Sequence, residues 1–191
     1  MDVYTAIAKR RSARCFKNEP VEVEKLVKMV DLARLSPSGA NLQSLKYIIV
    51  TDEAVRRELY PLIAYAGYIP EWNPEFEETP TAFIAVLNDT KIRPTNEATQ
   101  CDSGIAMMSI CLLAQAEGID SCMLGAIKRE EIRQVLSVDE GCDLLYMIGL
   151  GVSATENSCY DSSDEIKYQM DEAKNFRVPK RKLEDVLVKK I

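Results

Sequence analysis

Histidine is absent from this sequence of 191 residues. Its absence excludes hydrolase triads that use imidazole as the base, and metal sites with histidine ligands. No other side chains form an evident nucleophile–base pair in the sequence. Any chemistry therefore depends on a cofactor that brings its own reactivity.

Long apolar runs are also missing. The apolar runs, such as those at 105–108 and 144–150, fall well short of the roughly 18 residues needed to span a bilayer. The N-terminus opens directly into an amphipathic stretch, without the apolar core of a secretory signal. The net charge of −6 disfavours nucleic acid as a partner, because phosphate binding normally needs a basic surface. We therefore expect neither a membrane nor a nucleic acid as partner.

The six cysteines include no CxxC pair, so zinc and thioredoxin-type sites are disfavoured. Most of them lie among apolar neighbours, as Cys111 does between Ile110 and Leu112. Buried, reduced thiols are the simpler interpretation. They suit a reducing compartment, and we expect a cytoplasmic protein.

The length and the 47% apolar fraction predict one globular domain over residues 1–191. Apolar periodicity predicts helices over 2–10, 21–35, the segment from 52 to about 65, 97–117 and 128–136. Short apolar runs predict strands over 45–51, 81–87, 121–124 and 143–151, and the first of these is rich in β-branched residues. Residues 67–80 are expected to form a loop or short irregular helix, 153–164 a loop, and 177–190 a basic tail with a short amphipathic piece. The fold class is therefore α+β, with a central mixed sheet flanked by helices.

The segment 97–117 is the longest predicted helix. We expect its inward face to carry Ile105, Met108, Leu112, Leu113 and Ala116. Because its other side is also rich in apolar residues, the helix is expected to be buried nearly all round. Gly118 is placed to end it.

A cluster of positive charge ends the first predicted helix, and it consists of Arg10, Arg11, Ser12 and Arg14. Arginine binds phosphate oxygens bidentately, and this pattern is typical of an anion site. The alternative is that arginines near a helix C-terminus complement the helix dipole. Sequence spacing alone leaves both interpretations open.

Three further segments are weaker candidates. The loop that contains Pro37, Ser38, Gly39 and Asn41 offers small residues that let a flat ligand approach the backbone, although it also fits an ordinary connection. A strand end that passes through Leu124, Gly125 and Ala126 suits backbone N–H groups that face a ligand. The basic residues Lys180 and Arg181 fit a solvated tail, or a second arm for the same phosphate.

Residues 149–154 match the G-x-G-x-x-A dinucleotide-binding pattern. That pattern should open a helix in an early βαβ unit, whereas here a polar loop follows a late strand. We therefore disfavour a Rossmann site.

Taken together and in order, these segments resemble the nitroreductase family of FMN-dependent oxidoreductases. The resemblance spans nearly the whole chain. It rests on Arg10-Arg11-Ser12-x-Arg14-x-Phe16, Ser36-Pro37-Ser38, Asn41-x-Gln43, the strand 47–50, the long helix, the run 118–125 and the basic residues before Leu183. Two departures stand out, because Ser44 and Leu45 follow Gln43 where the family often has Pro and Trp, and Gly39 replaces a commonly polar residue.

The resemblance implies a homodimer with one FMN at each of two equivalent interface sites. By this analogy Arg10, Arg11, Ser12 and Arg14 hold the phosphate and the ribityl or pyrimidine edge, and Lys180 and Arg181 reach the same phosphate. Pro37, Ser38 and Gly39 of the second subunit would lie against the isoalloxazine ring, with Asn41 nearby. Leu124, Gly125 and Ala126 would line the ring at its redox-active nitrogen.

The implied activity is a ping-pong reaction in which NADH or NADPH reduces the flavin and a small electron acceptor, such as a nitroaromatic, quinone or enone, reoxidises it. Residues 67–78, with Tyr68, Trp72 and Phe76, are the expected lid. Their glutamates, at 71, 75, 77 and 78, would either disfavour anionic substrates or form a solvated face. The alternatives are a flavin-binding or sensing module without turnover, a flavin-fragmenting or dehalogenating relative, and a protein whose arginines bind another phosphorylated ligand.

Overall fold

A four-stranded sheet forms the centre of the protein. The computed structural model describes residues 1–191. The strands stand in the order β1-β2-β4-β3, and every neighbouring pair is antiparallel. Their bounds are β1 Leu45–Val50, β2 Ala82–Asp89, β3 Asp120–Leu124 and β4 Cys142–Gly151. All four strands predicted from the sequence are present.

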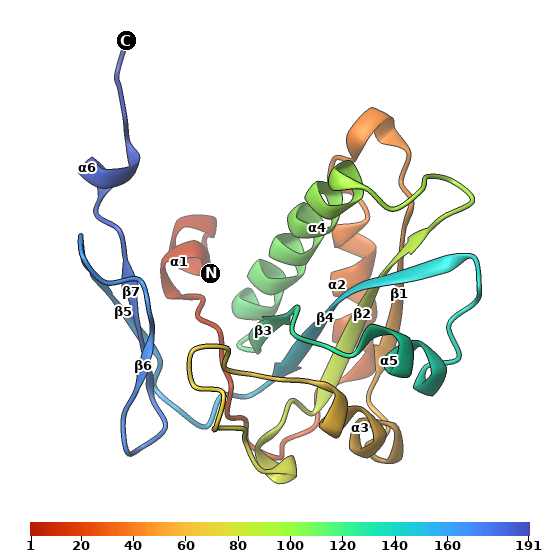
Figure 1. The fold of residues 1–191 in the computed structure, drawn as a ribbon, viewed down its shortest axis with the longest axis horizontal. Coiled ribbons are helices and arrows are strands. Elements are labelled where there is room, and N and C mark those ends of the chain that lie inside the picture. Colours follow the sequence, from red (N-terminus) through yellow and green to blue (C-terminus); the bar gives the residue numbers. More distant parts are fainter.

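Helices cover both faces of this sheet (Figure 1). The longer ones are α1 Val3–Lys9, α2 Val23–Ala33, α3 Glu53–Leu59, α4 Glu97–Ala116 and α5 Arg129–Val135. Short 3₁₀ turns lie at Gly39–Asn41, Tyr60–Leu62 and Phe76–Glu78, and α6 Leu183–Val186 follows near the C-terminus. The predicted α+β fold is confirmed. No helix combines the length and apolar content needed to cross a membrane.

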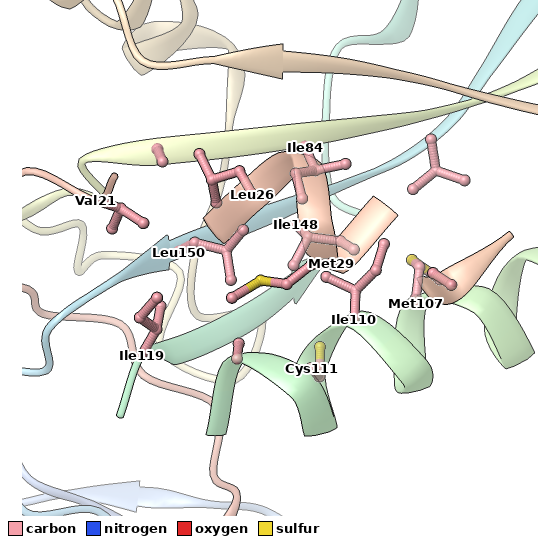
Figure 2. Packing of buried hydrophobic residues seen from close by; sticks show 14 residues of the cluster. Val21, Leu26, Met29, Ile84, Met107, Ile110, Cys111, Ile119, Ile148 and Leu150 are labelled. Atoms are coloured by element: carbon pink, nitrogen blue, oxygen red, sulfur yellow. The ribbon is translucent and has the colours of Figure 1, made fainter. Parts of the chain in front are cut away.

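Strand β2 explains the layered arrangement, because it is buried along its entire length. Alternate side chains on a strand point to opposite faces. Ile84 and Val86 join α2 and α4 in one core cluster, which Figure 2 shows around Ile110, Ile148 and Leu150. Phe83 and Leu87 join α3 and α5 in a second cluster on the opposite face. The sheet is therefore covered on both sides.

A second, smaller sheet lies beside α1 and apart from the central sheet (Figure 1). Its strands are β5 Ser158–Asp161, β6 Gln169–Met170 and β7 Phe176–Lys180, in the order β5-β7-β6. The pair β5–β7 is parallel and β6–β7 is antiparallel. The central sheet, which was predicted to be mixed, is therefore wholly antiparallel, and the parallel pair lies in the small sheet. The sequence could not show this, because apolar patterning marks a buried strand without fixing its direction. The sequence also predicted a loop at 153–164, and β5 corrects that prediction.

The long helix α4 begins with a capping box at Asn96 and ends just before Gly118, which has a φ of 74°. Its buried face carries Ser103, Met107, Ile110 and Ala114, at helical spacing. The sequence predicted a different face. Ile105 and Met108 are instead 36% and 41% exposed within one chain, so a strongly apolar stripe of α4 is left uncovered.

The glycine pattern at 149–151 serves packing within the sheet. An added Cβ at Gly149 would lie 2.5 Å from Pro80 Cγ, and one at Gly151 would lie 2.8 Å from Phe16 Cδ1. The next element after β4 is the strand β5 and not a helix, so the expectation that this is no Rossmann site agrees with the structure.

Four cysteines are buried and two, Cys101 and Cys159, are exposed, so the expectation of mostly buried, reduced thiols is confirmed. Burial raises the pKa of Cys15 and of Cys122 to about 11. Both thiols therefore stay protonated, and poorly nucleophilic, at neutral pH.

Truncation of the α4 core should be costly. Ile110 is fully buried between α4 and the sheet, so Ile110→Ala should lower the free energy of unfolding by about 2–5 kcal/mol through lost burial and a residual cavity. Urea unfolding at a fixed protein concentration measures this loss. Ile166→Ala, at a side chain exposed to solvent, is the matched control and should change it by less than about 0.5 kcal/mol. Equal losses in the two variants would contradict the assigned core.

Candidate functional site

The segment that carries Arg10, Arg11 and Arg14 is fastened to the edge of the central sheet. Helix α1 ends at Lys9, and the chain then turns to an extended conformation. Ser12 forms a parallel bridge with Ser121, and the Ala13 N–H donates to the Ser121 carbonyl at 3.1 Å. This backbone pairing places the arginines along β3.

The positive charges of this segment have no acidic partners. Arg11 donates to the Arg10 carbonyl at 2.6 Å and to Cys159 Sγ at 2.8 Å, and the Arg10 side chain makes no hydrogen bond. Ten ion pairs occur elsewhere in the chain, yet none includes an arginine of this segment, Lys180 or Arg181. In a protein of net charge −6, such a cluster fits an anionic ligand.

Arg14 differs from its neighbours because it also holds the small sheet in place. Its Nε donates to the Tyr65 carbonyl at 2.8 Å. Its guanidinium lies over the rings of Tyr168 and Phe176, at 4.4 and 4.7 Å from their centroids. Arg11 and Arg14 lie beyond the end of α1, so complementing the helix dipole explains at most Arg10.

The strand β3 continues from Ser121 to Leu124, and the chain then leaves the sheet at Gly125. Leu124 is buried in the second core cluster, whereas Gly125 and Ala126 are exposed. The N–H groups of these two exposed residues have no hydrogen-bond partner within the chain, although the Ala126 carbonyl accepts from Ala64 at 2.9 Å. Two free donors therefore lie on the strand that also anchors the arginines.

The basic residues near the C-terminus approach the same region through the small sheet. Cys159, which Arg11 contacts, is paired with Val178 on β7, and Lys180 ends that strand. Arg181 follows it, and its guanidinium donates to the Asp185 carbonyl at 2.6 Å. The structure thus brings Arg10–Arg14, Gly125–Ala126 and the basic end of β7 to one side of the protein.

Pro37, Ser38, Gly39 and Asn41 lie elsewhere. The Gly39 N–H donates to Asp102 Oδ1 at 2.9 Å, in the N-terminal part of α4. The arginine segment instead pairs with Ser121, whose hydroxyl lies beside Cys111 in the C-terminal half of the same helix. At 1.5 Å of rise per residue, Asp102 and Cys111 are separated by about 13 Å along the axis. Within one chain, the loop therefore does not lie next to the arginine cluster.

The 37–41 loop borders a pocket of about 140 Å³ between α2, β1 and α4. Its lining is mixed polar and apolar, and comprises Ala33, Arg34, Ser36, Pro37, Ser38, Gln43, Leu45, Tyr47, Asp102 and Ala106. Ala40, Asn41 and Gln43 all have positive φ, near 50°, which is uncommon for residues other than glycine.

Comparison with known proteins decides the family. The family model of the Nitroreductase family matches residues 7–152. The chain belongs to the nitroreductase family. A protein of Archaeoglobus fulgidus, provisionally named an NADH dehydrogenase/NAD(P)H nitroreductase, is 27% identical over 161 residues, which cover 81% of this chain and 87% of that protein.

Solved structures agree with this assignment. An FMN-dependent nitroreductase of Clostridium difficile R20291 is 27% identical, with a TM-score of 0.68 over 84% of this nitroreductase and 92% of that chain. A nitroreductase family protein of Clostridium novyi NT shares the fold, with a TM-score of 0.69, 24% identity, and coverage of 80% and 86%.

The lid-like segment of this nitroreductase rests on the small sheet. The Tyr68 N–H donates to Tyr168 Oη at 3.1 Å, and the Trp72 ring packs on Phe176 at 5.4 Å. Three of its four glutamates are engaged locally: Glu75 and Glu78 form a capping box, Glu78 pairs with Lys174 at 2.5 Å, and Glu77 lies 3.9 Å from Arg57. These glutamates are therefore largely engaged with the segment's own backbone and with neighbouring cations of the same chain.

The sequence analysis missed several residues that shape both halves of the candidate site. Tyr168 and Cys159 contact the arginines, and Arg93 and Asp102 hold the 37–41 loop. None of them lies in a recognisable motif. Asp102 alone carried a signal, because an acidic residue in the apolar helix 97–117 must find a partner if it is buried.

Proposed function

We propose that this nitroreductase is an FMN-dependent NAD(P)H oxidoreductase that works as a homodimer and reduces small electron acceptors. The observation that supports it most is the group of unpaired cationic side chains beside the free N–H groups at 125–126. The first suits a phosphate and the second suits a ring that gains negative charge on reduction. The FMN-dependent relative adds independent support.

Arg10, Arg11 and Ser12 would bind the FMN phosphate and its ribityl chain, with Lys180 and Arg181 as a second arm. Arg14 would contribute to the same region while it keeps the small sheet in place. Gly125 has no side chain that could obstruct the approach of a ring to its N–H group. The buried side chain of Leu124 would support the ring from below rather than touch it.

Bound FMN would supply hydride exchange between NADH or NADPH and an acceptor such as a nitroaromatic, quinone or enone, in a ping-pong sequence. The protein's part is to bind, orient and polarise. The N–H groups at 125 and 126 are fixed donors that need no rearrangement when charge develops near them. Side chains of the 67–78 segment would limit access of water.

Two features support the proposed homodimer. The arginine cluster and the 37–41 loop lie at separate places in one chain, and pairing of two chains would let the cluster of one and the loop of the other contact one flavin. Helix α4 also leaves Ile105 and Met108 exposed, and α1 leaves Tyr4 and Ile7 exposed. Burying such side chains against a second copy is favourable at roughly 25 cal/mol per Å².

The cofactor is tested by colour. Purified protein should be yellow, or become so when loaded with FMN, and should bleach on addition of NADH or NADPH without oxygen. Absorbance and anaerobic stopped flow measure both steps. Protein that takes up no FMN would contradict the proposal, and protein that holds FMN but is not reduced by either nicotinamide would be a flavin-binding module without turnover.

The phosphate site is tested by side-chain truncation. Arg10→Ala should weaken FMN binding by about 10- to 150-fold, which corresponds to the loss of 1.5–3 kcal/mol for a charge-assisted contact. Because the Arg10 side chain makes no hydrogen bond within the chain, the fold should survive. Arg14→Ala should also weaken binding, whereas Lys182→Ala, in the exposed tail, should have a much smaller effect. Flavin fluorescence titration gives the affinities, and similar losses for Arg10 and Lys182 would mean that the phosphate lies elsewhere.

The assembly is tested by size. The holo-protein should elute near 43 kDa, twice the 21.5 kDa chain mass. Met108→Glu places a charge in the proposed interface and should shift the protein toward monomer with loss of FMN, while Ile166→Glu, in the exposed loop between β5 and β6, should not. A monomeric wild type that retains FMN would exclude the shared site.

A further inference from the structure

A buried ion pair encloses the backbone of Gly39. Arg93 Nη1 lies 3.3 Å from Asp102 Oδ2, and the two side chains are only 12% and 5% exposed. The Gly39 N–H donates to Asp102 Oδ1 at 2.9 Å, and Arg93 Nη2 donates to the Gly39 carbonyl at 2.9 Å. Both polar groups of one peptide residue are thus held by the two ends of a single ion pair.

The Arg93 backbone is itself fixed. Its N–H donates to the Asp89 carbonyl at 3.2 Å, at the end of β2. Its carbonyl accepts from Asn88 Nδ2 at 2.9 Å, and the same amide donates to Thr95 Oγ1 at 2.9 Å. Asp102 stands on α4, the longest helix. The clamp therefore connects the 37–41 loop to the sheet and to α4.

The loop needs such support. Ala40 and Asn41, which follow Gly39 directly, both have a φ of 54°, a conformation that costs free energy for residues with a side chain. Within the loop the Asn41 N–H donates to the Ser38 carbonyl at 2.9 Å, and the Gln43 N–H donates to Ser38 Oγ at 3.1 Å. These local bonds shape the turn, and the clamp holds Gly39 itself against the sheet and α4.

We propose that Arg93 and Asp102 are positioning residues that hold the 37–41 loop in the shape required to lie against the flavin of the second subunit. This inference rests on the proposed function. It also accounts for glycine at position 39: the Arg93 guanidinium fills the space of a side chain there, and an added Cβ would lie 3.0 Å from Nη1 and 3.2 Å from Nη2. The Arg93 guanidinium can therefore occupy its place only because residue 39 is a glycine.

The first test measures the loop without flavin. In apo-protein, Arg93→Gln and Asp102→Asn should each raise hydrogen exchange at the amides of residues 38–43 at least severalfold, while exchange in β2 and β4 stays unchanged. Arg133→Gln, which breaks an ion pair with Glu130 on α5, is the matched control and should leave the loop amides unaffected. Unchanged loop exchange in both clamp variants would overturn the proposal, whether or not the protein binds FMN.

The second test measures the flavin. Arg93→Gln should weaken FMN binding about tenfold, the loss expected for one charge-assisted hydrogen bond, and should shift the visible flavin spectrum. Arg93→Lys should rescue this only partly, because an ammonium lacks the planar fork that reaches both Asp102 and the Gly39 carbonyl. Full rescue by lysine, or an unaltered spectrum in the glutamine variant, would mean that the pair acts only on stability.

The third test measures the energetic coupling between Gly39 and Arg93 with a double-mutant cycle. Gly39→Ala should displace the guanidinium and weaken FMN binding in the wild type, but should have almost no effect in the Arg93→Gln background, where the obstructing group is gone. Additive effects would contradict the clamp. Wild-type protein that fails to bind FMN would refute the proposed function but leave the exchange measurement decisive for the clamp.

Discussion

The hydrogen bond from Ala13 to Ser121, with the Ser12–Ser121 bridge beside it, is the contact on which the site depends. It joins a segment next to the N-terminus to the edge strand of the sheet, more than a hundred residues later in the chain. Without it the arginines would lie on a loose connection after α1. With it the arginines lie along β3, and the free N–H groups of Gly125 and Ala126 follow directly after the end of that strand. In the proposed function, the phosphate and the ring of the flavin would both be bound along this edge of the sheet.

The charge distribution makes this part of the protein attractive to an anion. The protein is acidic, and many of its cations elsewhere form ion pairs. The arginine cluster forms none, and backbone carbonyls and aromatic rings hold it in place. Arg11 on the Arg10 carbonyl and Arg14 over Tyr168 are examples. Such contacts orient guanidinium groups without neutralising them, since carbonyls and rings carry no net charge. The cluster therefore keeps its full attraction for an anion.

The sequence predicted much of the fold because local signals were strong where both sides of an element are buried. Strand β2, which is apolar over 82–87 and buried along its length, is the clear case. It failed where partners decide the structure. The polar segment that forms β5 becomes a strand only because β7 lies beside it. The inward face of α4 was misplaced because two adjacent stripes carry apolar residues, and no pattern in one chain tells which stripe packs on the sheet.

The site shows the same limit. Arg10–Arg14 and Gly39 could be found as motifs, but the residues that orient them could not. Arg93 sits in an unremarkable loop, and its importance follows only from where β2 ends and where α4 begins. Asp102 breaks the apolar character of α4 because the helix has two tasks along its length. Its C-terminal half packs on the core, and its N-terminal part must accept hydrogen bonds from a loop whose backbone is strained. A wholly apolar helix would have packed as well, but it could not have held Gly39.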